Sequence, residues 1–272
     1  MRIDRLSLLL NISLKLSIIL VLGIFVLLVG FIFFKGIGAF SFKFLEWQYN
    51  SNNISMMPAI INTLQMIIFA LLLSIPFGIF GAIFLTEYSH KKSKIISFVQ
   101  IVSETLVGIP SIVYGLFGYL AFVVYFGFKT SIIAGVLTLS IMILPLILRS
   151  TQEALLNVPE SYKEASFALG ISKLRTIFYI LLPAAIPGIL AGIILSIGRI
   201  IGESAALLYT SGSVAQMAGL FDSGRTLSVH LYALSSEGLY INEAYSSAMI
   251  LILLVLLINI CSNLIAKKFT RN

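Results

Sequence analysis

The chain has 272 residues, of which 59% are hydrophobic and 11% are charged, and its mean hydropathy is +1.05. Soluble domains carry about 25% charged residues, so these charges are too few to cover a water-facing surface. The composition excludes an ordinary soluble domain and predicts a polytopic, all-α protein of the lipid bilayer. The net charge is +7, and because the cations flank apolar runs, we assign them to membrane topology and expect no nucleic-acid binding.

Six apolar segments follow in chain order, each near the roughly 20 residues that a helix needs to cross the hydrocarbon core. They cover approximately residues 16–34, 60–85, 97–125, 131–148, 182–210 and 245–266. The first has no convincing small-x-small cleavage site before Lys35, so we expect an uncleaved span. We divide the chain into residues 1–55, with the first span and an outer loop, and a membrane core over residues 56–272.

Basic residues indicate the orientation of these spans. With the N-terminus inside, the inner segments hold thirteen lysines and arginines, and the outer loops hold four. Cationic loops resist translocation, so this asymmetry predicts a multi-pass protein of the cell membrane with both termini in the cytoplasm. It also places the long loop of about residues 149–181 in the cytoplasm and the loop 211–244 outside.

The cytoplasmic loop has the pattern of two short helices joined by a tight turn. Pro159 suits the first turn of a helix, and Gly170 suits the left-handed residue that ends one. Between these two positions, we expect one helical face formed by residues at helical spacing: Tyr162, Ala165, Ser166 and Leu169. A second amphipathic helix is expected to begin near Ser172 and to enter the membrane at Leu182 and Pro183. Such a projection suits insertion into the groove of a partner protein, although a simple amphipathic connector has the same helicity.

Charged residues inside the apolar segments mark interior surfaces, because a central Arg costs roughly 2.5–3.5 kcal/mol on insertion scales. Arg199 and Glu203 lie four residues apart, and we expect them on one helical face as a pair. The pair is either a structural link between spans or part of a substrate path, in which the Arg offers its fork to an oxyanion. Glu104 and Ser111 are the other candidates for that path, although a polar packing contact also explains Glu104.

Small residues recur every four positions in three segments. The strips are Ala184, Gly188, Gly192 and Ser196; Ser74, Gly78 and Ala82; and Ser111 with Gly115. Such strips let helix backbones approach closely, so we predict a packing role for them and no chemistry.

The cytoplasmic loop also resembles the EAA signature of ABC importer permeases. The matching residues are Glu164, Ala165 and Ser166, then Gly170, then Ile180, Leu182 and Pro183. Ser166 departs conservatively from the Ala that the family has at its position. The stretches GIPSIVYGLFG (108–118) and GRIIGESAALLYTSG (198–212) are similar to those of phosphate-importer permeases, and SVHLYALSSEG (228–238) resembles their A-type subunit, PstA.

This resemblance implies a type I ABC importer permease (MetI-like) fold and the import of inorganic phosphate by alternating access. It implies a C-type permease as heterodimer partner, an extracytoplasmic phosphate-binding protein, and an ATPase dimer that docks on the loop. No Gly-Lys dipeptide occurs in the sequence, so a Walker A phosphate cradle is missing. We therefore expect no enzyme activity, cofactor or metal in this chain, with ATP and Mg bound by the partner ATPase.

Other interpretations remain open from the sequence. A permease for another oxyanion, such as sulfate or molybdate, belongs to the same class. A secondary transporter or channel would work without an ATPase, and the cytoplasmic loop would then be dispensable. A membrane enzyme would need a metal site or a nucleophile with its base, but His90 and His230 fall on opposite sides of the predicted topology.

Overall fold

The computed structural model describes residues 5–47, 49, 53–88, 94–238 and 240–270, and its elements there are all helices. Five helical stretches of that part are long and apolar enough to cross a membrane, and a bent pair makes a sixth if it counts as one span. The five contain α1 Arg5–Ala39, α2 Met57–Ile83, α5 Ile132–Leu156, α8 Leu182–Gly202 and α11 Ile241–Thr270. The bent pair is α3 Lys94–Gly108 with α4 Ser111–Gly118. This confirms the predicted all-α membrane fold of about six spans.

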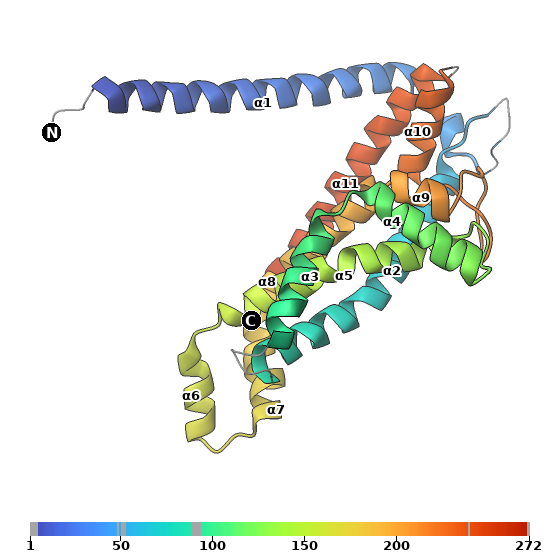
Figure 1. The fold of residues 1–272 in the computed structure, drawn as a ribbon. Coiled ribbons are helices and arrows are strands. Elements are labelled where there is room, and N and C mark those ends of the chain that lie inside the picture. Colours follow the sequence, from blue (N-terminus) through green and yellow to red (C-terminus); the bar gives the residue numbers. More distant parts are fainter. Residues whose placement is uncertain (1–4, 48, 50–52, 89–93, 239, 271–272) are drawn as a thin grey trace.

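Shorter elements extend or connect the spans. In the described part, π-helical turns continue neighbouring helices: η2 Phe84–Tyr88 after α2, η3 Tyr119–Tyr125 after α4, and η4 Ile177–Leu181 before α8. The remaining elements are the 3₁₀ turn η1 Phe42–Leu45 and the helices α6 Glu160–Ala168, α7 Lys173–Thr176, α9 Ala205–Thr210 and α10 Leu227–Glu237. Figure 1 shows the α6–α7 hairpin projecting from one end of the bundle, with α9 and α10 toward the other end.

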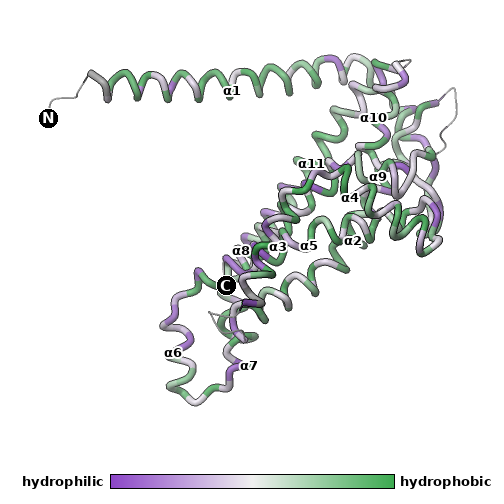
Figure 2. The backbone as a smooth tube through the Cα atoms, in the orientation of Figure 1, coloured by the Kyte–Doolittle hydropathy of each residue, from purple (hydrophilic) through white to green (hydrophobic). Residues whose placement is uncertain are grey.

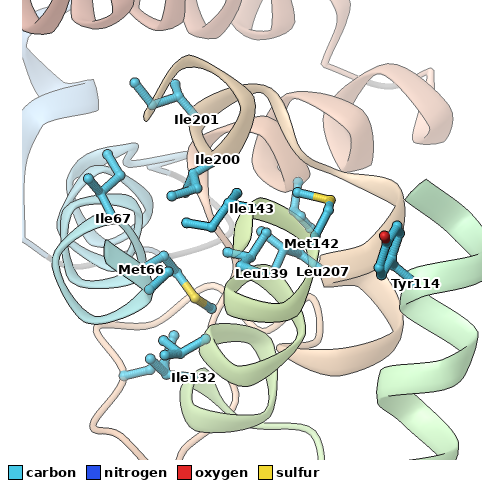
Figure 3. Close-up of a cluster of buried hydrophobic side chains, with 14 of the residues drawn as sticks. Met66, Ile67, Tyr114, Ile132, Leu139, Met142, Ile143, Ile200, Ile201 and Leu207 are labelled. Carbon is cyan, nitrogen blue, oxygen red and sulfur yellow. The ribbon is translucent and has the colours of Figure 1, made fainter. Parts of the chain in front are cut away.

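The centre of the bundle is α5, which packs against both α2 and α8. Figure 3 shows the apolar cluster where these helices meet α4 and α9. Its fully buried side chains include Met66 from α2, Leu139, Met142 and Ile143 from α5, and Leu207 from α9. This core fixes the C-terminal half of α8, because Ile200 and Ile201 belong to it.

The first helix, α1, contacts the bundle near its C-terminal end. The Phe31 ring lies edge-on to Tyr245 of α11 with centroids 5.7 Å apart, and the Ser246 hydroxyl donates to the carbonyl of Gly36 at 3.1 Å. The rest of α1 projects away from the other helices and is apolar along its length (Figures 1 and 2). A helix that is apolar on every side and uncovered by its own chain suits a lipid environment.

Three glycines of the predicted small-residue strips lie at close helix contacts. A side-chain carbon at Gly78 would fall within 2.7 Å of Ile147, and one at Gly188 within 2.6 Å of Ala154, so α2 and α8 both approach α5 closely. At Gly192 such a carbon would overlap Ser150 of α5. The structure confirms that these residues permit backbone approach.

Two segments predicted as single spans are broken in the structure, which corrects that expectation. Residues 97–125 form two helices bent by 102°, because Pro110 has no N–H to continue α3 and disfavours helical backbone before it. The Tyr114 hydroxyl donates at 2.7 Å to the carbonyl of Leu106, near the end of α3. The segment 182–210 also breaks, because α8 ends at Gly202 and Glu203 adopts extended backbone before α9.

We expect Gly192→Val to destabilise the bundle by about 1–3 kcal/mol, because the new methyl groups overlap Ser150 and force α8 away from α5. The thermal unfolding midpoint of the detergent-purified protein measures this. The control is Gly23→Val in α1, where a side-chain carbon has no atom within 4 Å. Equal midpoints for the two variants would contradict the assigned packing.

Candidate functional site

The loop predicted to face the cytoplasm forms the α6–α7 hairpin, and local sequence rules explain its turn. Gly170 has a φ of +74°, a left-handed conformation that glycine adopts without strain. The N–H of Gly170 donates to the carbonyl of Phe167 at 2.9 Å, and the N–H of Ile171 donates to that of Ser166 at 3.1 Å. This is the hydrogen-bond pattern of a Schellman motif, which closes the end of α6 and turns the chain into α7.

The residues of the predicted helical face, Tyr162, Ala165, Ser166 and Leu169, differ in exposure. Ser166 is buried, and its hydroxyl lies 2.7 Å from that of Thr176 in α7. The other three are exposed, with Leu169 at 79%. The four positions keep their helical spacing in α6, but the hairpin partner α7 covers only Ser166.

The hairpin is fastened to the end of α2. The Lys163 ammonium forms a salt bridge with Glu87 of η2, and both side chains are mostly buried. The Lys173 ammonium donates to the carbonyl of Glu87 and lies 4.6 Å from the centroid of the Tyr88 ring. These contacts join positions 76 and 86 residues apart, which sequence spacing did not indicate.

The signature residues occupy two environments on this hairpin. Glu164, Ala165 and Gly170 are exposed. Ile180 and Leu182 are half-buried, and their neighbour Leu181 packs in a cluster with Ile83 and Leu155. Pro183 is exposed at the start of α8. The surface around the turn also exposes large apolar side chains: Tyr162, Phe167, Leu169, Leu174 and Tyr179. One end of the signature is therefore open to a partner, and the other is packed against the bundle.

The structure does not pair Arg199 with Glu203. Glu203 lies beyond the end of α8, is 7% exposed, and its carboxylate accepts from the N–H of Ala206 at 3.0 Å. Its carbonyl accepts from the Ser228 hydroxyl at 2.5 Å. The expected common helical face is lost because the helix ends between the two residues.

The other two predicted path residues also lie apart from Arg199. The Glu104 carboxylate is 3.9 Å from the guanidinium of Arg149, which also pairs with Glu153 in α5. These side chains are largely exposed, so the contacts contribute little. Ser111 is half-buried at the start of α4.

Arg199 instead lines a cleft of about 760 Å³ between α3, α5, α8 and α11. Two further polar side chains reach the same cleft, Asn259 and Asn263 of α11. The rest of the lining is apolar or glycine: Val107, Leu146, Ala191, Ile194, Leu195 and Gly198. Sequence reasoning missed both asparagines, although two amides four residues apart inside an apolar run were a readable signal.

The structure offers no metal centre among the residues that it describes, where no group of three or more potential metal ligands occurs. His90 lies outside the described residues. His230 of α10 is fully buried, and this burial, assisted by the nearby Arg225, lowers its pKa to about 3. The imidazole is therefore neutral near pH 7.

The sequence of this chain matches a known protein family. Residues 74–272 match the family described as "Binding-protein-dependent transport system inner membrane component". The chain belongs to this family of permeases. The matched region includes the hairpin and all the helices that line the cleft.

The permease is similar to curated relatives of the same class. It is 32% identical to the probable ABC transporter permease protein YqgI of Bacillus subtilis, over 89% of this chain and 90% of the relative. It is 39% identical to the phosphate transport system permease protein PstA 2 of Mycobacterium bovis, over 65% of this chain and 58% of the relative. It is 37% identical to the PstA homolog of Mycoplasma genitalium, over 79% of this chain but 34% of the relative. The chain thus spans only part of the length of these PstA relatives. Its family and its relatives together show that it is an ABC importer permease.

Solved structures show the same fold. The permease aligns with a bacterial alginate ABC transporter in complex with its periplasmic protein, with a TM-score of 0.72, 17% identity, and coverage of 99% of this chain and 97% of that one. It aligns with the MetNI methionine ABC transporter with a TM-score of 0.61, 20% identity, and coverage of 79% and 94%. These likenesses confirm the predicted MetI-like fold.

We expect Glu87→Gln to loosen the hairpin of this permease. A hydrogen-bonded ion pair with mostly buried partners contributes about 1.5–3 kcal/mol, so amide hydrogen exchange in α6 should accelerate about tenfold or more. Mass spectrometry of peptides from residues 160–176 measures the rate. Glu160→Gln, an exposed position on the same helix, is the control, and equal exchange in both variants would contradict the anchoring role.

Proposed function

We propose that this permease imports inorganic phosphate, driven by ATP that a partner ATPase hydrolyses. The observation that carries the phosphate assignment is the similarity to relatives named as phosphate transport permeases, at 37–39% identity over 65–79% of this chain. The half-buried guanidinium of Arg199 in a membrane cleft supports it, because a planar cationic fork suits a tetrahedral oxyanion.

The α6–α7 hairpin is the proposed docking element for the ATPase. Its exposed apolar side chains lie on the same hairpin as the exposed Glu164 and Ala165. A cluster of large apolar side chains on a water-facing surface marks a site that a partner protein covers. A similar C-type permease would complete the membrane part as a heterodimer, and an extracytoplasmic binding protein would deliver phosphate. This arrangement places both termini and the hairpin in the cytoplasm.

Reconstituted transport tests the substrate. Proteoliposomes with the permease, its membrane partner, the ATPase and the binding protein should take up phosphate only with ATP, and excess sulfate should compete weakly. Uptake of sulfate in preference to phosphate would overturn the phosphate assignment. Uptake that persists without the ATPase would instead favour a secondary transporter or channel.

Docking is tested at the turn of the hairpin. Gly170→Arg should abolish copurification of the ATPase and reduce ATP-driven uptake at least tenfold, because a side chain at φ +74° is strained and adds charge at the exposed tip. Membrane insertion should be normal, since the turn lies outside the bundle. The control is Gly238→Arg, which has a similar φ of +68° at the end of α10. Normal ATPase binding by Gly170→Arg would contradict the docking role.

A further inference from the structure

The cleft beside Arg199 contains an unusual set of polar groups for a membrane-spanning segment. Arg199 of α8 and Asn259 and Asn263 of α11 line it together, and the remaining lining residues are apolar or glycine. We propose that this cleft is a binding site for a phosphate oxyanion, in which Asn259 and Asn263 supply neutral hydrogen bonds beside the charge of Arg199. The proposal rests on the proposed function and adds two substrate-binding residues to it.

Helix geometry brings the three side chains to one place. Asn259 and Asn263 are four residues apart, so their amides lie one above the other on one face of α11. On α8 the lining residues Ala191, Leu195 and Gly198 recur at helical spacing, which turns that face toward the cleft. A side-chain carbon at Gly198 would have no atom within 4 Å, so the space next to Arg199 is open.

The polar side chains of this cleft are free to bind a further group. Arg199 and Asn259 are half-buried and Asn263 is exposed, and none of these side chains forms a hydrogen bond or ion pair with the described residues. By contrast, the hydroxyl of Ser196, three residues before Arg199 on α8, donates to the carbonyl of Gly192 at 2.9 Å. Polar groups in an apolar span are stabilised when a polar partner satisfies them, so the cleft suits a polar occupant.

The charges around the cleft favour an anion as that occupant. Arg199 is the one charged residue among the described residues that line it, and Glu203 is turned toward the N-terminus of α9. An Asn amide both donates and accepts hydrogen bonds, so its oxygen can accept a hydrogen bond from the O–H group of monohydrogen phosphate. Sulfate has no such O–H group. The donor set therefore suits a protonated phosphate better than a fully ionised oxyanion.

Two kinds of molecule carry a phosphate group that fits this cleft: free phosphate and the headgroup of an anionic lipid. The volume of about 760 Å³ falls within the range of small-molecule sites. We assign the site to free phosphate, because the cleft shares Arg199 with the proposed substrate path.

The test uses the complete transporter in proteoliposomes with Asn259→Leu and Asn263→Leu, which keep the side-chain size and remove the amide. Each should raise the KM for phosphate about tenfold or more, because a hydrogen bond to a charged group is lost. Asn242→Leu, at the outer end of the same helix and outside this cleft, should leave the KM unchanged.

The outcomes separate this inference from the proposed function. A wild-type complex without ATP-dependent phosphate uptake overturns both. Wild-type uptake with unchanged KM in Asn259→Leu and Asn263→Leu overturns only the cleft assignment. Complexes that fail to assemble with these variants and also with Gly198→Leu, which fills open space within this chain, identify a subunit interface and overturn the assignment.

A second measurement distinguishes the lipid source. Native mass spectrometry of the purified complexes counts bound anionic phospholipids. The proposal expects equal lipid counts for wild type and Asn263→Leu together with a raised KM. Loss of one bound lipid with an unchanged KM would assign the cleft to a lipid headgroup and overturn the proposal.

Discussion

The close approach of α2 and α8 to α5 is the constraint on which the rest of the structure depends. Lipid tails are as apolar as the helix surfaces, so burial of apolar side chains drives helix association weakly in a bilayer. Contact between backbones supplies the packing, and Gly78, Gly188 and Gly192 make it possible. The orientation of α8 on α5 then decides which residues face the cleft, and α8 also carries the hairpin through α7 and η4.

Local rules made the hairpin and the helix contacts predictable from the sequence. Gly170 marked the left-handed turn, and the four-residue spacing of small residues marked the packing faces. Two features depend on contacts between residues far apart in the chain, so the sequence did not reveal them. The break after Gly202 is stabilised by Ser228, 25 residues beyond Glu203, and the hairpin is fastened by Glu87, 76 residues before Lys163.

The buried charges of this chain differ in how they are satisfied. Glu203 accepts hydrogen bonds through both its carboxylate and its carbonyl, so its burial is compensated. Arg225, 6% exposed, lies 4.6 Å from the centroid of the Tyr49 ring, and two of its nitrogens have no hydrogen-bond partner among the described residues. Arg199 is only half-buried and faces a cleft. The Arg199 side chain is therefore accessible from the cleft, whereas the protein itself encloses Arg225.

The hairpin and the cleft are joined by one helical path. Residues Lys173–Gly202 run without interruption through α7, η4 and α8, and about 40 Å of helix separates Lys173 from Arg199. The two asparagines belong to α11, which does not carry the hairpin. If an ATPase docks on the hairpin as proposed, a movement of α8 driven from there would change the position of Arg199 relative to the two amides. Such a change would alter the affinity for the anion proposed to bind between them, which is what an ATP-driven importer needs in order to bind on one side and release on the other.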